Sequence, residues 1–598
     1  MVVTRRRSPL SAVRVAATAA LIGTLGLTMF ASSAGGATDP AANPTTNLHY
    51  AINRPLCQES VAPGIMRCFS FKRVPVKKGT KHAYSYRTNA SRGPAGGYTP
   101  QALATAYDFD PKINRSNLTV AIVLWHDAPN VLSDLNTFNA RYGLKQETAA
   151  TFRKVNERGA SSPLPARDPG AAGEIALDTQ AVRGACNTCK ILLVEADDPY
   201  DTDLAAAVNT AVRLGANIIS NSYGTPELKS SSAITNAFNH PGVVLTVSTG
   251  DDGWFGWDYG NTQGDRGDGV ASFPSSSPYV VAVGATTLTL DSANQRVSET
   301  VWNGNGPHDS IGMARQQPMG ASGGGCSTQY PARPYQSHQP GYGDARCGGT
   351  RLAADMSLVG DPQTGFDVFD SYGSGGWVTI GGSSLSAPLA AGMFALAGGA
   401  QGARYPSSAL YGNSQTYPST RFDVTSGGNG FCGSDSPADC AAAIYQPAAQ
   451  YAPTKNPNRL NMNMVDCSFG PGPSEYVPQS RNRACNAAAG FDGPSGVGTP
   501  HGLGLFKRTD PIMRITHPST TNYGRSTTFV ASGSERLPHT YLSTLSWNWG
   551  DGRTSTVPSR TGKTVTHAYA RKGTFTVTLT VYDTRYQSTV TQTRITVR

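Results

Sequence analysis

An alternation of buried-strand and helix patterns limits this chain, more than any other feature, to one class of fold. Continuous apolar runs at 118–124, 191–195 and 243–247 are typical of strands buried on both faces. Helical stretches at 174–183 and 204–214 lie between them. Strands that alternate with helices predict an α/β fold, with a parallel sheet flanked by helices. In such folds the active site lies at the carboxyl ends of the strands.

The C-terminal part of the chain follows a different pattern and predicts a second domain. Beyond Lys507 to Pro511 apolar residues recur with a period of two, most plainly at 574–582, as in a half-exposed antiparallel strand. We therefore expect an immunoglobulin-like β-sandwich at 511–598. Its Trp-Asn-Trp-Gly-Asp-Gly sequence at 547–552 resembles the PKD (polycystic-kidney-disease-type) module, which often trails secreted hydrolases. A ligand site on the tandem Trp is the alternative to the core position that we favour.

The N-terminus has the pattern of a secretory signal peptide at 1–37. A basic stretch that includes Arg5 and Arg14 precedes the apolar residues 15–30, and small residues follow at 31–37. A membrane anchor is the alternative, but the apolar stretch is short for a span that needs about 20 residues. We expect a secreted, extracellular protein without stable membrane insertion.

A short, Pro-rich and basic extension with little periodicity follows the signal, at 38–97. The net charge of +10 is thinly spread over 598 residues, and no Lys/Arg block occurs beyond the extreme N-terminus. This distribution favours an ordinary solvated surface and argues against nucleic-acid binding.

The ten cysteines agree with an oxidising destination. Their even number and local spacing favour five short-loop disulfides, although the last four cysteines could exchange partners. The C-x-x-C motif at 186–189 could instead be redox-active or half of a zinc site. No second C-x-x-C or cluster of His completes a metal site, which favours a structural bridge. The expected couples are Cys57 with Cys68, Cys186 with Cys189, Cys326 with Cys347, Cys432 with Cys440, and Cys467 with Cys485.

Ser384 is a candidate nucleophile. It stands at a Gly-rich turn that leads into an apolar, Ala-rich stretch at 385–392. A Ser at the start of such a helix exposes its hydroxyl near the positive helix end, which suits an attacking group. Gly-Ser turns are common without any catalytic role, so this motif is weak by itself.

A Ser nucleophile needs a base, and the sequence offers carboxyl groups for this role. Neither His126 nor His240 has an evident carboxylate to orient it. Glu174 and Asp178 are four residues apart, so on a helix they project from the same face. Two adjacent carboxyl groups resist ionising together, which raises one pKa and lets them share a proton. The alternative is a solvated pair with no function.

A third acidic group follows the apolar run at 243–247. Asp251 lies in the turn at 248–253. A carboxyl group there stabilises a developing oxyanion only while it is protonated, which indicates acidic conditions. An ordinary Asp-rich turn is the alternative.

Together these motifs resemble the sedolisin (serine-carboxyl peptidase) family, which is related to the subtilisins in fold. The family's Glu-x-x-x-Asp helix corresponds to Glu174 and Asp178, and its Ser-Gly-Asp turn places the oxyanion role on Asp251. Its Gly-Thr-Ser-x-x-x-Pro motif corresponds to 382–388 and makes Ser384 the nucleophile. The resemblance runs from Tyr98 to Leu505 and implies a sedolisin-like peptidase domain at 98–506.

The resemblance also implies one structural calcium ion. Its ligands would be Asp423 and Asp492 together with the carbonyls of Val424, Ala488 and Gly490, an all-oxygen set that suits calcium. A surface loop is the alternative.

Three departures from the family pattern stand out. Ser383 replaces a Thr but keeps a hydroxyl, and a long segment with four cysteines lies between Asp423 and Ala488. The extension at 38–97 is far too short for the family's large prodomain, so folding and self-inhibition must differ or be supplied otherwise.

The resemblance implies a secreted endopeptidase that cleaves proteins or peptides at acidic pH through an acyl-enzyme on Ser384. Glu174 would act as general base and then acid, Asp178 would tune it, and Asp251 would support the oxyanion. The alternatives are a tripeptidyl exopeptidase of the same chemistry and a catalytically silent binding protein. The PKD-like module could contact a polysaccharide or a collagen-like polymer, or serve as a spacer.

Overall fold

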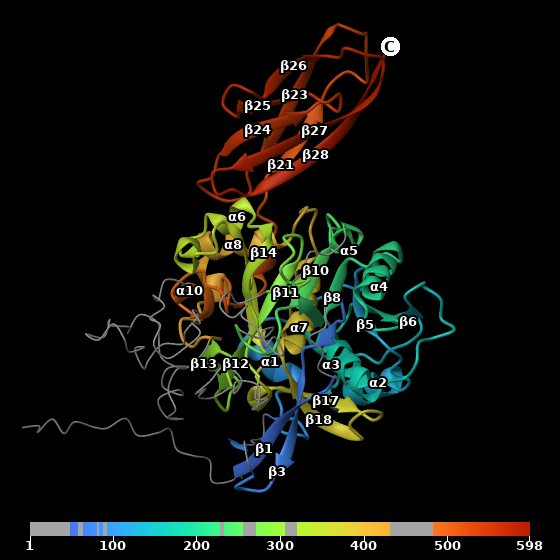
Figure 1. Cartoon of the computed structure of the whole chain (residues 1–598), viewed down its shortest axis with the longest axis vertical. Coiled ribbons are helices and arrows are strands. Elements are labelled where there is room, and N and C mark those ends of the chain that lie inside the picture. The colour runs from blue at the N-terminus through green and yellow to red at the C-terminus, as the bar shows by residue number, and fades with distance from the viewer. Residues whose placement is uncertain are drawn as a thin grey trace, which may run out of the picture. The chain divides into compact units, whose positions relative to one another are not determined.

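The computed structural model of the chain (Figure 1) describes most of the residues beyond the N-terminal region. The predicted signal peptide at 1–37 lies outside the described residues. Every helix in the described part of the chain is too short or too polar to traverse a bilayer. The described ranges are 48–57, 64–80, 83–87, 92–227, 232–254, 271–304, 320–430 and 482–598.

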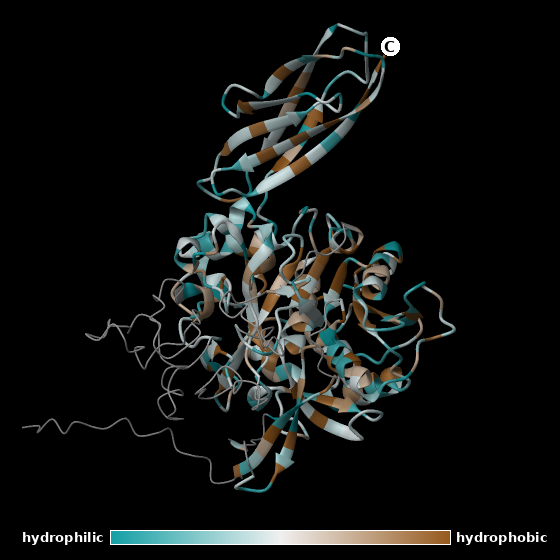
Figure 2. Cartoon of the chain, in the orientation of Figure 1, coloured by the Kyte–Doolittle hydropathy of each residue, from teal (hydrophilic) through white to brown (hydrophobic). Residues whose placement is uncertain are grey.

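A largely parallel sheet forms the centre of the larger domain and confirms the predicted α/β class. Apolar side chains fill its strands, which are almost entirely buried and appear brown in Figure 2. The parallel order is β6 (Phe152–Asn156), β7 (Lys190–Ala196), β5 (Thr119–Trp125), β8 (Ile218–Asn221), β10 (Val244–Ser248), β12 (Val281–Leu290) and β16 (Met356–Val359). The strand β13 (Arg296–Val301) pairs with β12 in the antiparallel sense.

Two helices that carry the candidate catalytic residues pack against each other beside this sheet. They are α3 (Pro169–Ala185) and α7 (Ser383–Ala397). The helix α3 begins with Asp168, whose side chain accepts a hydrogen bond from Ala171 N, and with a Pro in its first turn. Nearly every residue of α3 is buried, so its few charged side chains need partners inside the protein.

The residues before the peptidase motifs form strands within the same domain. The strands β1 (Leu48–Pro55), β3 (Phe71–Val76) and β4 (Tyr84–Arg87) join β17 (Phe366–Asp370) and β18 (Gly376–Gly381) in an antiparallel sheet of order β17-β18-β3-β1-β4. A second small sheet contains β2 (Arg67–Cys68), β9 (Tyr223–Pro226) and β11 (Ser272–Phe273). The expected lack of periodicity in this part of the chain therefore does not mean a lack of structure. Its strands are stabilised by pairing with residues that are distant in the sequence, such as those of β18.

The remaining elements surround this core. They are α1 (Pro100–Ala106), α2 (Val131–Tyr142), α4 (Asp201–Arg213), α5 (Ser232–Ala237), β14 (Gly325–Pro331), α6 (Pro334–Ser337), β15 (Thr350–Ala353), α8 (Ser407–Thr416), β19 (Arg421–Phe422), α10 (Asn482–Cys485) and β20 (Thr499–Pro500).

The C-terminal residues form the predicted β-sandwich, in which apolar and polar residues alternate along the strands (Figure 2). Trp547 and Trp549 are buried and stack with ring centroids 5.1 Å apart, which confirms that they are core residues. One sheet is β21 (Ile512–Thr516), β23 (Ser526–Ser534) and β26 (Thr564–Ala568); the other is β22 (Thr520–Thr521), β28 (Ser588–Val597), β27 (Gly573–Asp583), β24 (Leu542–Asn548) and β25 (Thr554–Pro558).

Three of the predicted disulfides are confirmed. They join Cys57 to Cys68, Cys186 to Cys189, and Cys326 to Cys347. The bridge at 186–189 therefore supports the structural interpretation of the C-x-x-C motif. The two other predicted couples include Cys432, Cys440 and Cys467, which lie outside the described residues.

Candidate active site

The candidate nucleophile lies at the first turn of α7, directly after β18. Gly382 joins the two elements at φ 120° and ψ 168°, a conformation that only glycine adopts readily. A Cβ on this residue would overlap with the carbonyl oxygen of Phe69 and with Asp251 Oδ2. This glycine therefore presents Ser384, which is wholly buried, at the positive end of a 15-residue helix.

The carboxyl pair predicted on α3 lies beside Ser384. Glu174 and Asp178 are both wholly buried. Burial raises the pKa of Glu174 to about 7, while the neighbouring hydroxyls of Ser384 and Ser70 act in the opposite direction. Burial and the nearby Glu174 carboxylate raise the pKa of Asp178 well above its usual value. One oxygen on each carboxyl group has no hydrogen-bond partner among the described residues, which leaves both groups able to hold a proton.

Ser222 connects the carboxyl pair to the nucleophile. Its hydroxyl donates to Asp178 Oδ1 at 2.9 Å, and its carbonyl oxygen accepts from Ser384 Oγ at 3.2 Å. It lies between β8 and β9, at the carboxyl end of a parallel strand. The sequence analysis assigned no role to this residue, because its two hydrogen bonds join elements that are distant in the sequence.

Asp251 lies on the other side of the nucleophile. Its Oδ1 accepts from Ser383 N at 2.7 Å and from Ser383 Oγ at 2.8 Å, so the Ser that replaces the family's Thr keeps the hydroxyl contact. Asp251 Oδ2 has no hydrogen-bond partner among the described residues. Burial raises the pKa of this carboxyl group well above its usual value, and the charges of Asp252 and Glu174 act in the same direction. The group is therefore suited to stay protonated in acid and to donate a hydrogen bond.

The two histidines considered as alternative bases have other contacts. His126 Nε2 lies 3.6 Å from Asp198 Oδ1, whose side chain is half exposed. His240 Nε2 lies 3.1 Å from Asn209 Oδ1. The hydroxyl of Ser384 instead faces Ser222 and the N–H of Phe69. The carboxyl pair is thus the better candidate for the base.

Two loops bring together the residues predicted to bind calcium. Gly490 N donates to Asp423 Oδ2 at 2.9 Å, and Ala488 N donates to Asp492 Oδ2 at 2.9 Å. Burial, and to a smaller degree the Asp423 charge, raises the pKa of the wholly buried Asp492 to about 8. Val424 is also buried. Two carboxyl groups held close fit the chemistry of calcium, although one of them, Asp423, already has Arg421 Nη1 2.6 Å from its Oδ1.

The calcium assignment remains a prediction. No group of three or more His, Cys, Asp or Glu side chains that could hold a metal occurs in the described ranges. The predicted site contains only two such side chains, and its other ligands are backbone carbonyls.

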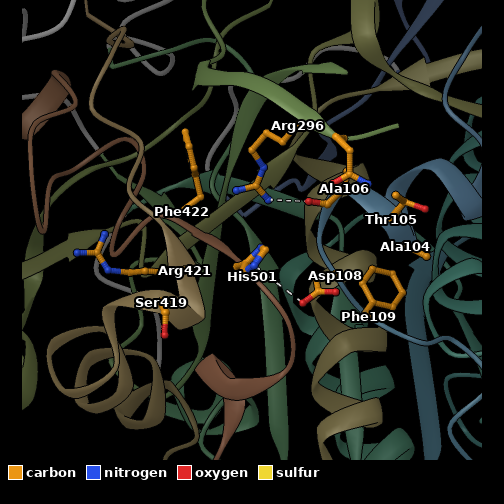
Figure 3. A pocket seen from close by; sticks show the side chains of 11 residues that line it. Ala104, Thr105, Ala106, Asp108, Phe109, Arg296, Ser419, Arg421, Phe422 and His501 are labelled. Carbon is orange, nitrogen blue, oxygen red and sulfur yellow. Dashed lines mark hydrogen bonds and ion pairs between the residues drawn. The ribbon is translucent and has the colours of Figure 1, made fainter. Parts of the chain in front are cut away.

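A pocket of about 870 Å³ is lined by other residues, among them Arg296, Phe422 and His501 (Figure 3). Arg296 donates to the carbonyl of Ala106 at its edge, at 3.2 Å, and His501 Nε2 lies 3.9 Å from Asp108 Oδ2. None of the four catalytic candidates lines this pocket. The candidate active site is therefore identified by the chemistry and burial of its residues, and not by this pocket.

Comparison with known proteins agrees with the geometry. Residues 170–410 match the subtilase family, and residues 508–597 match the PKD domain. Sedolisin from Pseudomonas sp. (strain 101) is 30% identical over 362 residues, which cover 57% of this chain and 57% of that protein. Xanthomonalisin from Xanthomonas sp. (strain T-22) is 28% identical over 426 residues, which cover 63% of this chain and 49% of that protein. The chain thus spans about half the length of these curated relatives.

A solved structure shows the same fold. The structure of Pseudomonas sedolisin, a serine-carboxyl proteinase complexed with two molecules of pseudo-iodotyrostatin, aligns with a TM-score of 0.50 at 26% identity. The alignment covers 68% of this chain and 96% of that one. Residues 170–410 are thus homologous to the subtilase domain of the sedolisins, and residues 508–597 form a PKD-type domain.

Proposed function

We propose that this sedolisin homologue is a serine-carboxyl endopeptidase that hydrolyses peptide bonds at acidic pH through an acyl-enzyme on Ser384. One observation carries the proposal: the Ser384 hydroxyl lies beside the buried carboxyl of Glu174, which shares a buried helix face with that of Asp178. A solvated carboxyl pair without a function would be neither buried nor close to a hydroxyl group.

The geometry supports one sequence of proton transfers. Glu174 takes the proton of Ser384 Oγ as this oxygen attacks the peptide carbonyl, and then delivers it to the departing amine. Asp178 shares a proton with Glu174 and is oriented by the hydroxyl of Ser222. The developing oxyanion is stabilised by Ser384 N–H and by the protonated Asp251.

The raised pKa of Asp251 supports an upper limit to the active pH range. The oxyanion role needs Asp251 protonated, and the carboxyl pair is competent while it retains one shared proton. Both requirements are lost as the pH rises through the pKa values of these groups. Activity should therefore decline towards alkaline pH.

A pH–rate profile with matched variants tests the proposal. Ser384→Ala and Glu174→Gln should each lower kcat by roughly 10⁴-fold or more, as for groups that act as one unit. Glu195→Gln is the control, since this carboxyl is equally buried but bonds to Ala128 N and lies beside Lys154. A profile that peaks at neutral pH, or unchanged proteolysis by Ser384→Ala, would reject the mechanism. The second outcome would favour a catalytically silent binding protein.

Product analysis separates the two peptidase alternatives. An endopeptidase cuts peptides with blocked N-termini, whereas a tripeptidyl exopeptidase leaves them intact. We expect cleavage of the blocked peptides.

Export and calcium binding belong to the same proposal. The signal pattern at 1–37 supports secretion. A calcium ion would be held by Asp423 and Asp492 with the carbonyls of Val424, Ala488 and Gly490. When bound it would join the two loops that carry these residues and neutralise their carboxylates.

A further inference from the structure

The guanidinium of Arg421 lies on one of the two carboxylates proposed to bind calcium. Arg421 belongs to β19, the short strand that leads directly to Asp423. Its Nη1 lies 2.6 Å from Asp423 Oδ1. The other oxygen of this carboxylate, Oδ2, accepts a hydrogen bond from Gly490 N at 2.9 Å. A positive charge of the chain itself therefore contacts an atom that calcium would need.

Calcium and this guanidinium would compete for the same oxygen. Calcium binds carboxylate oxygens at about 2.3–2.6 Å, which is close to the distance at which Arg421 Nη1 lies from Asp423 Oδ1. Two cations in contact with one oxygen repel each other, and water screens the repulsion weakly because the Arg421 side chain is only 12% exposed. An arginine cannot relieve the repulsion by losing its proton. Calcium would therefore bind Oδ1 at full strength only if the guanidinium moved away.

The contacts of Arg421 allow this movement. Its Nε and Nη1 are buried, and neither has a hydrogen-bond partner among the described residues. The contact with Asp423 is therefore an ion pair without hydrogen-bond geometry. Such a pair holds the side chain less firmly than the bidentate pair that Arg351 forms with Asp355, at 2.9 Å and 2.6 Å. The pocket of Figure 3 gives the side chain room, because Arg421 itself lines that space of about 870 Å³.

A second arginine supports the same loops in a different way. Arg483 Nη1 donates to the carbonyl oxygens of Ala489 at 2.9 Å and of Phe491 at 3.1 Å. These carbonyls alternate along the chain with those of Ala488 and Gly490, which are proposed calcium ligands. Arg483 thus fixes the loop through carbonyls that calcium would not use, whereas the arginine of β19 contacts a ligand atom.

We propose that Arg421 is a built-in competitor of calcium, which neutralises Asp423 until the ion displaces it. This inference rests on the calcium site of the proposed function and gives that site a regulator within the chain. The guanidinium balances the charge of Asp423 and keeps the two loops together at low calcium concentrations. The calcium affinity is then set by the difference between the two cations as partners of the carboxylate. Calcium therefore stabilises the parent less than it would stabilise a chain without this guanidinium.

Calcium titration of variants at position 421 tests the inference. Each variant is made in the full-length Ser384→Ala chain, so that proteolysis does not interfere, and calorimetry with calcium chloride measures Kd. Arg421→Gln removes the charge but keeps a long polar side chain, and it should bind calcium roughly 10- to 100-fold more tightly than the Ser384→Ala chain. Arg421→Lys keeps the charge and should restore most of the weaker affinity.

Thermal unfolding provides a second measurement. With a chelator present, Arg421→Gln should have a lower Tm than the Ser384→Ala chain, because Asp423 has lost its counter-ion. With saturating calcium this gap should close, because the ion then neutralises the carboxylate in both chains.

Two other arginine variants are controls. Arg158→Gln breaks a different Arg–Asp pair, in which Arg158 Nη1 lies 2.7 Å from Asp197 Oδ2, and it should change neither Kd nor the response of Tm to calcium. Arg483→Gln removes support from the loop and should weaken calcium binding, which is the opposite of the effect expected at position 421.

The outcomes distinguish this inference from the calcium site itself. Equal or weaker calcium binding by Arg421→Gln overturns the inference and leaves the site standing, with Arg421 as a residue that orients its ligand. If neither chain binds calcium, both the inference and the site are rejected. Binding that is unchanged by Asp423→Asn places the ion elsewhere and also rejects both.

Discussion

Replacing a proposed catalytic acid should make this protein more stable at neutral pH. Glu174 is wholly buried, and burial raises its pKa from the usual 4.5 to about 7. Below pH 4.5 the group is protonated in both the folded and the unfolded chain, so its ionisation does not change the free energy of unfolding. Between these values the unfolded chain releases the proton and the folded chain retains it, so stability falls as the pH rises.

The size of the effect follows from the two pKa values. Their difference corresponds to about 3 kcal/mol of lost stability above pH 7. Glu174→Gln removes the ionisation but keeps a side-chain oxygen that can accept the hydrogen bond from Ser70. The variant should therefore match its parent near pH 4 and exceed it by up to about 3 kcal/mol near pH 8. The variant also removes the negative charge of Glu174 that raises the pKa of Asp178, and this change stabilises the folded chain in the same direction.

Urea unfolding at both pH values measures the difference. Ser384→Ala serves as the background, so that the chain stays intact, and Glu174→Gln is added to it. The unfolding transition of the PKD domain provides an internal reference. An equal gain at pH 4 and pH 8, or no gain at either, would refute the argument that a buried ionisable carboxyl causes the effect.

Three further predictions concern Asp251, the glycine that precedes the nucleophile, and the calcium site. Asp251→Ala should lower kcat by roughly 10²–10³-fold, whereas Asp251→Asn, which keeps a donor at every pH, should lose less and remain active further into the alkaline range; steady-state kinetics across pH distinguish them. Gly382→Ala should cost about 1–3 kcal/mol in urea unfolding, because φ 120° disfavours any side chain; an unchanged midpoint would contradict the assigned backbone. A chelator should lower the Tm of the parent, and calcium should restore it, while Asp423→Asn should respond to neither.

Local sequence patterns were sufficient to predict the buried strands of the core and the carboxyl pair of the candidate site. The strands β5, β7 and β10 of the main sheet are largely apolar runs, as burial on both faces requires. Glu174 and Asp178 share a helix face because they are four residues apart. The three disulfides in the described residues join near neighbours, so spacing alone predicted them.

The contact between Phe69 and Ser384 could not be predicted from local sequence. Phe69 and Ser384 are 315 residues apart, and their contact depends on the pairing of β3 with β18. The Pro within β3 weakens the strand signal, and nothing in the sequence reveals a pairing partner. Ser222 was missed for a related reason, since its two hydrogen bonds connect elements that are distant in the sequence.

The bridge between Cys57 and Cys68 has a consequence for the residues at the nucleophile. Cys68 ends β2 and directly precedes Phe69, whose carbonyl oxygen accepts from Ser384 N at 3.0 Å. Because the disulfide joins this part of the chain to a residue just beyond the end of β1, a reducing agent would loosen the backbone that lies next to Ser384.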